Sequence, residues 1–308
     1  MSDVVDVMAA TVRLEQLIGG GQSTVGTGFV VLAQGPDGAP RTILITAHHV
    51  FANMPNDKAK VGFRAQDPEG GWRYAPVNVR IRDAEGGPLW TRHPTQDVAA
   101  IELPEGVTTA ALPTTQLPGE RALEILGVQP GTEMMTLGFP YGLSANTAGF
   151  PILRSGRVAS YPLSPADRYP TYLVDFDVFG GNSGGPVYAL APGASRATPQ
   201  VVITGLLTQQ IKLDEQRLSI GNVTQADFIT ETISLMAAVG PTEVATAEGV
   251  LPRIEPAPAS GLPAPSAHAR LQEAWRTVVE DVSILLRRLW IVLRDGFLAL
   301  ITPEARRM

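Results

Sequence analysis

Cysteine is absent from all 308 residues of the chain. The chain therefore has none of the disulfides that are common in secreted proteins, and no thiolate with which to bind a metal. Its four histidines show no metal-ligand spacing such as HExxH. The sequence also contains no phosphate-binding loop and no dinucleotide fingerprint. We expect neither a metal site nor a cofactor.

Long hydrophobic runs are missing as well. Residues 1–6 are acidic and lack the basic start and apolar core of a secretory signal. Near the C-terminus the most apolar stretch is interrupted by Arg287, Arg288, Arg294 and Asp295, so no run approaches the roughly 18 residues that span a bilayer. Together with the missing cysteine, these absences predict a cytoplasmic protein.

Basic residues are outnumbered, because 24 Lys and Arg stand against 30 Asp and Glu and give a net charge of −6. An acidic chain is poorly suited to nucleic acid, whose phosphates attract basic surfaces. Turn formers are abundant, with 31 Gly and 26 Pro. They separate short apolar runs, as expected for an all-β chain. These strand-like runs are 27–32, 42–46, 73–80, 98–103, 134–139, 171–178, 187–190 and 201–209.

The most informative motif is the hexapeptide Gly-Asn-Ser-Gly-Gly-Pro at residues 181–186. Acyl transfer needs an exposed hydroxyl beside backbone N–H groups that can hold a developing oxyanion, and glycines allow the backbone to present both. Ser183 supplies such a hydroxyl. Because a serine is a poor nucleophile at neutral pH, the motif predicts a base and an orienting acid elsewhere in the chain.

Candidates for both groups lie upstream of the hexapeptide. The apolar run at 42–46 leads into two histidines, His48 and His49, which suits an imidazole held at the end of a strand. Asp97 opens the apolar run 98–103, and a carboxylate at the start of a buried strand suits a partner for an imidazole N–H. Only one of the two histidines can be the base.

In these motifs and their order, the chain resembles the chymotrypsin-like (trypsin-like) serine proteases over roughly residues 7–238. Members of that family carry Thr-Ala-x-His, then an Asp followed by apolar residues, then Gly-x-Ser-Gly-Gly-Pro. This chain has Thr-Ala-His-His at 46–49, then Asp97, then the hexapeptide at 181–186. The match covers all three motifs in the family's order.

The resemblance implies a role for each matching residue. His49 is the base, Asp97 orients it, and Ser183 attacks the substrate. The N–H groups of Gly181 and Ser183 form the oxyanion hole. His48 remains the rival for the base.

The resemblance also implies the architecture, which is all-β with two six-stranded antiparallel β-barrels. The base and the acid come from the first barrel and the nucleophile from the second, with the site in the cleft between them. We expect this protease domain to span residues 1–238. A Pro/Ala-rich linker at 239–266 and an amphipathic helical tail at 267–308 are expected to follow it.

Asn182 is a departure from the animal digestive members of the family. Those proteins carry Asp at this position, where it pairs with the amine released by zymogen cleavage. Asn182 cannot form that ion pair, so activation by N-terminal insertion is not expected. The Gly-Asn-Ser-Gly pattern is similar to bacterial members, of the HtrA-like and glutamyl-endopeptidase-like branches.

The substrate pocket is less clearly defined by the sequence. The resemblance places Thr208, Gln210 and Gly221 in its walls. Asp177, six residues before the candidate nucleophile, lies where trypsin-like members hold the carboxylate that binds Lys or Arg. Asp175 shares a strand face with Asp177, and HtrA-like relatives carry an Asp at that earlier spacing without a basic preference. Both alternatives stay open.

The C-terminal tail has a helical pattern of its own. Its apolar residues recur four and three positions apart alternately, which predicts one stripe of a helix. They are Leu271, Trp275, Val278, Val282, Leu285, Leu289 and Val292. Three interpretations are open for residues 267–301: packing on the protease domain, contact with a second copy or another helical partner, or peripheral binding to a membrane surface.

Two functions follow from these motifs. The first is a serine endopeptidase that hydrolyses protein or peptide substrates through an acyl-enzyme intermediate. The alternative is a catalytically weak or inactive protease-like binding module that recruits a partner through its C-terminal helix. All three triad positions are filled, which favours the enzyme. The remaining histidine near the site, His93, lies in a polar loop and is interpreted as a surface residue.

Overall fold

The computed structural model describes residues 3–35, 38–108, 110–118, 122–191, 200–213, 216–238 and 247–248. All of them belong to one structural unit, Met1–Arg253. The helical tail expected at 267–308 lies outside the described residues. The same holds for the expected linker at 239–266, apart from residues 247–248.

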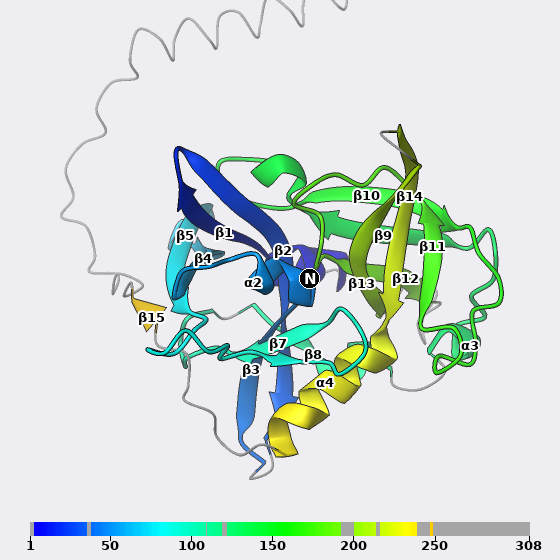
Figure 1. Ribbon diagram of the computed structural model, residues 1–308, viewed down its shortest axis with the longest axis horizontal. Coiled ribbons are helices and arrows are strands. Elements are labelled where there is room, and N and C mark those ends of the chain that lie inside the picture. Colours follow the sequence, from blue (N-terminus) through cyan, green and yellow to red (C-terminus); the bar gives the residue numbers. More distant parts are fainter. Residues whose placement is uncertain are drawn as a thin grey trace, which may run out of the picture. The chain divides into compact units, whose positions relative to one another are not determined.

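Residues 11–113 and residues 247–248 form a mostly antiparallel sheet of nine strands (Figure 1). Its longer strands are β1 (Thr11–Gly19), β2 (Gln22–Gln34), β3 (Pro40–Thr46), β4 (Lys58–Gln66), β5 (Trp72–Arg80) and β7 (Ala99–Glu102). Three short strands are added to these six: β6 (Thr91–Arg92), β8 (Leu112–Pro113) and β15 (Ala247–Glu248). The order is β15-β5-β4-β1-β2-β3-β7-β6, and β8 pairs with β2 in parallel.

The second half closes into a six-stranded barrel, in the order β10-β11-β14-β13-β12-β9. Its strands are β9 (Glu133–Gly138), β10 (Ile152–Val158), β11 (Thr171–Asp175), β12 (Pro186–Ala191), β13 (Gln200–Leu213) and β14 (Gln216–Gln225). All its strand pairs are antiparallel. The expected all-β, chymotrypsin-like architecture is confirmed, with one difference: the N-terminal half is a nine-stranded sheet where a second six-stranded barrel was expected.

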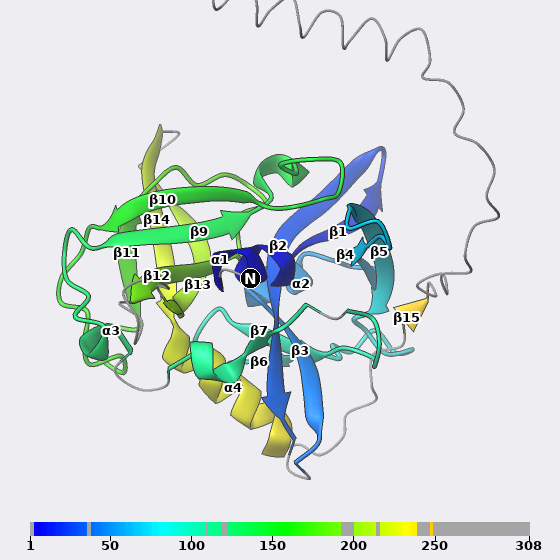
Figure 2. The same cartoon turned by 180° about the vertical axis from the view of Figure 1, so that it is seen from behind.

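Helices join the two halves. The helix α4 (Ala226–Ala238) follows the last barrel strand and reaches back to β6 and β7 of the N-terminal sheet, as the yellow coil in Figure 1 shows. On the other side, α1 (Asp3–Ala10) contacts β1 and β2 as well as β13 of the barrel, and it lies between the two halves in Figure 2. The shorter helices are α2 (His48–Ala52), α3 (Ala122–Ile125), η1 (Thr114–Gln116) and η2 (Pro140–Gly142).

The hydrophobic core is continuous across the two halves. Phe29 and Ile45 of the N-terminal sheet are fully buried, and they belong to the same cluster as Tyr188 and Leu206 of the barrel. Burying one such side chain contributes about 1.5–3 kcal/mol. A second cluster fills the barrel itself. Because side chains of both halves share one core, the loops that meet between the halves rest on a common packed base.

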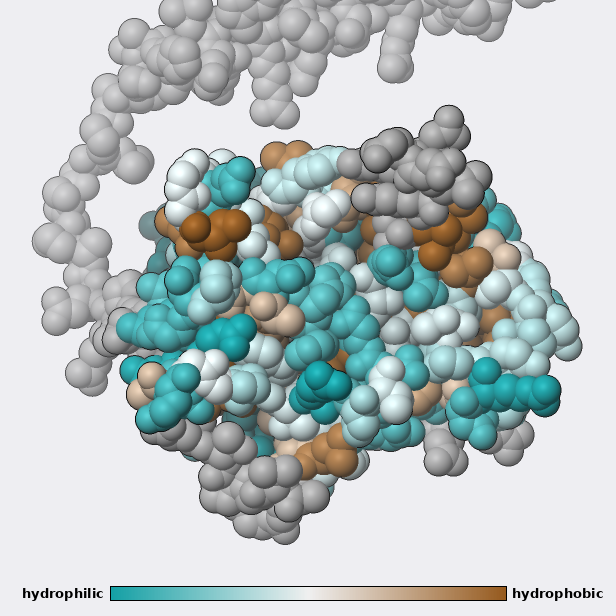
Figure 3. Space-filling model, in the orientation of Figure 1, coloured by the Kyte–Doolittle hydropathy of each residue, from teal (hydrophilic) through white to brown (hydrophobic). Residues whose placement is uncertain are grey.

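The surface carries no single large apolar area on the face seen in Figure 3, where brown patches are separated by hydrophilic ones. Within the described part of the chain, no helix has both the length and the apolar character that a membrane span requires. Among the described residues, the most exposed large hydrophobic side chains are Tyr161, Leu17, Leu143 and Tyr141.

Candidate active site

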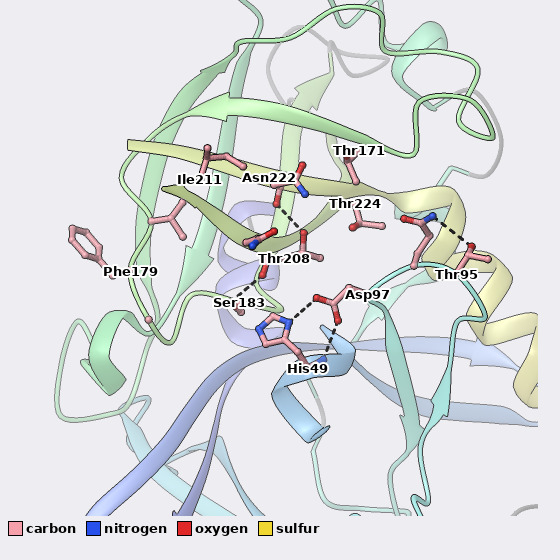
Figure 4. A pocket seen from close by; sticks show the side chains of 14 residues that line it. His49, Thr95, Asp97, Thr171, Phe179, Ser183, Thr208, Ile211, Asn222 and Thr224 are labelled. Carbon is pink, nitrogen blue, oxygen red and sulfur yellow. Dashed lines mark hydrogen bonds and ion pairs between the residues drawn. The ribbon is translucent and has the colours of Figure 1, made fainter. Parts of the chain in front are cut away.

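His49 lies where a strand changes into a helix. The strand β3 ends at Thr46, Ala47 is extended, and α2 begins at His48. The backbone N–H of His49 donates to Oδ1 of Asp97 at 2.9 Å, and the ring Nδ1 lies 2.6 Å from Oδ2. The close-up in Figure 4 shows the ring between the carboxylate and Ser183. The structure therefore brings together the three residues that the sequence selected.

Asp97 lies in the loop between β6 and β7 and is partly buried. Burial alone would raise the pKa of this carboxyl. The hydrogen bonds from His49 and the charge of its ring act in the opposite direction, and the net effect lowers the pKa of Asp97 below its ordinary value. The carboxylate is thus ionised at neutral pH. It can accept the Nδ1 proton of His49 and leave Nε2 as the acceptor.

Ser183 lies in the loop before β12, in one cavity with His49 and Asp97. The cavity has a volume of about 860 Å³. The Ser183 hydroxyl donates to the carbonyl of Thr208 at 3.2 Å, and the described residues contain no hydrogen bond between Ser183 and His49. A serine hydroxyl has one proton to donate, so it has to leave the carbonyl of Thr208 before it can donate to the imidazole. Catalytic hydrogen bonds are often incomplete before a substrate binds.

The expected oxyanion-hole donors are unpaired. Among the described residues, no group accepts a hydrogen bond from the N–H of Gly181 or of Ser183. The carbonyl of Gly180 accepts the N–H of Tyr141 at 2.6 Å. In a trans peptide the C=O and N–H point in opposite directions, so this bond directs the N–H of Gly181 away from Tyr141. Gly181 has φ +96°, a conformation that favours glycine.

His48, the rival for the base, is bound elsewhere. Its Nδ1 accepts the indole N–H of Trp90 at 3.1 Å, and the two rings lie 6.0 Å apart. Burial, followed by the charge of Arg92, lowers the pKa of His48. Both oxygens of Asp97 bind His49, and neither binds His48. His48 therefore packs beside the His49–Asp97 pair without taking part in it.

His93 was expected at the surface, and this expectation is wrong. Its side chain is only 6% exposed, because the loop before Asp97 folds against α4. Its Nε2 lies 2.9 Å from Oε2 of Glu231 on that helix, and its Nδ1 accepts the backbone N–H of Gln96 at 3.0 Å. His93 thereby fixes the loop that presents Asp97. No pattern in the sequence indicated this long-range contact.

The expected pocket residues do not all lie in the same place. Thr208 lines the cavity that holds Ser183. Gly221 faces the barrel interior, where an added Cβ would lie 2.6 Å from the ring of Phe176. The backbone of Gln210 pairs with Gly221 between β13 and β14, while its side chain lies outside the described atoms.

Asp177 lies outside the cavity that Ser183 lines. It lines a separate cavity with Asp175, and it accepts a hydrogen bond from the hydroxyl of Ser219 at 2.5 Å. The reason is the alternation of side chains along an extended segment. Val174, Phe176 and Val178 point inward and are buried, so both aspartates point outward.

Thr27 on β2 contacts the loop that carries Ser183, residues 179–185, which we call the nucleophile loop. Thr27 was not identified from the sequence as part of the site. Its backbone N–H donates to the carbonyl of Ser183 at 2.8 Å, and its hydroxyl donates to the carbonyl of Gly181 at 2.6 Å. The same hydroxyl accepts the N–H of Phe139 at 3.1 Å. The available signal was a polar residue between two glycines in an apolar strand, Gly-Thr-Gly at 26–28.

No ligand set for a metal is apparent at this site. The described ranges contain no group of three or more His, Asp or Glu side chains that could hold an ion. The polar groups of the cavity are suited to proton transfer and oxyanion binding by the protein itself.

The two-part β fold, with a serine, a histidine and an aspartate in one cavity, is that of the chymotrypsin-like serine proteases. The family model of the trypsin-like peptidase domain matches residues 26–193. This match covers more than half of the chain, which therefore belongs to the trypsin-like peptidase family. No curated protein matches its sequence.

Three solved protease structures are similar to this chain. The serine endoprotease from Yersinia pestis is 15% identical, with 77% of this chain covered and a TM-score of 0.45. The match covers 66% of that protein, just under two thirds of its length. The Rv3671c protease from M. tuberculosis, in its active form, is 19% identical with a TM-score of 0.46, covering 78% of this chain and 85% of that one. Protease Anisep from Arthrobacter nicotinovorans is 15% identical with a TM-score of 0.44, covering 75% and 96%.

Proposed function

We propose that this chain is a serine endopeptidase that uses His49, Asp97 and Ser183. The observation that carries the proposal is the pair of hydrogen bonds between His49 and both oxygens of Asp97, in a cavity that Ser183 also lines. An imidazole bound in this way keeps its proton on Nδ1 and offers the lone pair of Nε2. That is the form in which it can accept a proton from a serine.

Acylation begins when the Ser183 hydroxyl turns away from the Thr208 carbonyl. Nε2 of His49 takes the hydroxyl proton as Oγ attacks the carbonyl carbon of the substrate peptide. The negative charge that develops on the carbonyl oxygen is stabilised by the N–H groups of Gly181 and Ser183. His49 then gives its proton to the departing amine, and the acyl-enzyme remains.

Deacylation repeats these steps with water as the nucleophile. His49 takes a proton from the water, the hydroxide attacks the ester, and the proton returns to Oγ of Ser183 as the acid product leaves. Asp97 stays ionised throughout and stabilises the imidazolium, in keeping with its lowered pKa. The reaction needs only groups of the chain and water.

The walls of the cavity favour an uncharged side chain before the scissile bond. Besides the histidine and aspartate of the site, the cavity is lined by neutral residues, among them Val178, Thr208 and Asn222. Asp177 lies in a separate cavity, and among the described lining residues the one carboxylate is that of Asp97, whose two oxygens both bind His49. The sequence left open whether the substrate residue before the scissile bond is preferably Lys or Arg. This arrangement supports a pocket without that preference.

A fluorophosphonate probe tests the proposal because it reacts only with an activated serine. Labelling of the full-length chain is expected at Ser183, located by mass spectrometry, and it should be lost in Ser183→Ala. Ser155→Ala is the matched control, since Ser155 is exposed and lines a different cavity. Equal labelling of Ser183→Ala and wild type would show that the nucleophile is another residue.

The alternative is a protease-like binding module, and one contact favours it. The Ser183 hydroxyl is bound to the Thr208 carbonyl instead of His49. If this state persists with substrate present, the cavity would bind peptides without cleaving them. Such a module is expected to bind peptides from a library with no fluorophosphonate labelling and no cleavage products.

A further inference from the structure

The nucleophile loop, residues 179–185, contains no charged side chain. Asn182 is neutral and 2% exposed, and no described group forms a hydrogen bond with its Oδ1. An ion pair from within this loop therefore cannot hold it in place. Glycine has little preference for one backbone orientation, so the direction of the Gly181 N–H must be imposed by neighbouring groups.

One such neighbour is Thr27, which is fully buried in the N-terminal sheet. Its hydroxyl binds the carbonyl of Gly181 at 2.6 Å, and its backbone N–H binds the carbonyl of Ser183 at 2.8 Å. Its own carbonyl accepts the hydroxyl proton of Thr46 on β3 at 2.7 Å. One residue thus ties two carbonyls of the nucleophile loop to a rigid pair of strands.

A second contact acts on the peptide that precedes Gly181. The N–H of Tyr141 holds the carbonyl of Gly180, although Tyr141 has φ +52°, which L-residues rarely adopt. The next carbonyl, that of Gly142, accepts Nη1 of Arg13 at 2.7 Å. Arg13 is itself fixed by the hydroxyl of Tyr74 at 3.1 Å.

We propose that Thr27 and Arg13 are positioning residues of the oxyanion hole. Thr27 holds the peptide after Gly181, and Arg13 holds the turn whose Tyr141 N–H binds the peptide before it. The two peptide planes that flank Gly181 are thereby fixed from the N-terminal sheet. We call these contacts of Thr27 and Arg13 the clamp. The catalytic consequence of the clamp rests on the proposed function, but its effect on the order of the nucleophile loop can be measured without activity.

Thr27→Val tests the hydroxyl, because valine keeps the shape of threonine and removes the bond to Gly181. Removing one oxyanion-hole donor typically lowers kcat about 10²–10³-fold. For a donor that is misplaced but still present, we expect kcat toward p-nitrophenyl acetate to fall about ten- to a hundred-fold, with KM within about twofold of wild type. Thr27→Ser restores the hydroxyl and should recover most of the rate.

Thr11→Val is the matched control for the loss of a buried hydroxyl. Thr11 is also fully buried in the N-terminal sheet, and its hydroxyl donates to the carbonyl of Val7 at 2.7 Å, away from the nucleophile loop. We expect its kcat to stay near that of wild type. If Thr27→Val and Thr11→Val have the same kcat, Thr27 is a structural threonine and the inference is overturned.

Arg13→Gln tests the second contact, and Arg73→Gln is its control. Arg73 lies on β5 of the same sheet and pairs with Asp67 at 3.4 Å. A lower rate of fluorophosphonate labelling is expected for Arg13→Gln, together with an unchanged rate for Arg73→Gln. Equal labelling rates in these two variants would exclude a positioning role for Arg13.

Hydrogen–deuterium exchange of the segment 179–185 separates this inference from the proposed function. The N–H groups of Asn182 and Gly185 are hydrogen-bonded within the loop, and that of Gly184 is bonded to Leu207 on β13, so their exchange reports the order of the loop. Thr27→Val and Arg13→Gln should exchange faster here than Thr11→Val. Faster exchange without labelling of the wild type would support the clamp and contradict the peptidase. Unchanged exchange would refute the clamp whatever the activity.

Discussion

His49 binds Asp97 at two points, because its backbone N–H donates to Oδ1 at 2.9 Å while its ring Nδ1 lies 2.6 Å from Oδ2. One residue supplies both contacts, so the backbone at the start of α2 sets the orientation of the carboxylate toward the ring. A carboxylate held in this orientation accepts a proton from Nδ1, and it therefore selects the tautomer of His49 with the proton on Nδ1.

Replacing Asp97 with Asn should lower kcat by about 10³–10⁴-fold, with a small effect on KM. The amide N–H of asparagine would favour the tautomer with the proton on Nε2, which cannot accept the serine proton. Ester hydrolysis by the purified variant measures the effect. Asp175→Asn, at an exposed position outside the cavity, is the control. A loss below about tenfold in Asp97→Asn would contradict the assigned orienting role.

Stability should fall as the pH drops below about 6.5, the ordinary pKa of histidine, through the titration of His48. Its folded-state pKa is lowered by burial and by the charge of Arg92, so between the folded and unfolded values the unfolded chain binds more protons. The free energy of unfolding therefore rises with pH between the folded-state and unfolded-state pKa values of His48. Asp97 adds a separate loss at lower pH, below about 4, because its folded pKa is lowered too.

The variant His48→Asn isolates the histidine contribution, because its amide oxygen can still accept the N–H of Trp90. Thermal melting between pH 7 and pH 5 should show a smaller decrease in Tm for this variant than for the wild type. Identical pH dependence in the two proteins would mean that His48 does not contribute to the loss.

Asp177→Asn should leave the substrate preference unchanged. Asp177 is exposed, lines a separate cavity and binds Ser219, so the expected change in stability is within about 0.5 kcal/mol. The ratio of kcat/KM for peptides with Arg and with Ala before the scissile bond measures the preference. Asn222→Asp, which places a carboxylate in the cavity wall, should raise that ratio. A fall of the ratio in Asp177→Asn would place Asp177 in the pocket after all.

Removal of residues 267–308 should lower the number of chains per particle, which is the molar mass from light scattering divided by the mass of one chain, because the apolar stripe of the expected helix suits pairing with a second copy. Fluorophosphonate labelling of Ser183 should persist in the shortened chain. An unchanged number of chains per particle would instead favour packing on the protease domain or binding to a membrane, and vesicle co-sedimentation of the full-length chain distinguishes these two.

Short-range patterns in the sequence were sufficient to predict the all-β class and to select three candidate site residues. A hydroxyl among glycines, a histidine after an apolar strand and an aspartate before one are local signals. The structure places Ser183, His49 and Asp97 in one cavity. Each of these residues lies next to a regular strand, and the periodicity that predicts the strand also places its end.

Contacts between distant segments were decided only by the tertiary structure. Asp177 lies outside the nucleophile cavity because the inward positions of its segment are taken by apolar side chains. His93 is buried because its loop meets a helix that follows about 130 residues later. Thr27 reaches the nucleophile loop because the two halves share one core. Such contacts depend on how strands and loops pack, and a linear sequence pattern does not contain that information.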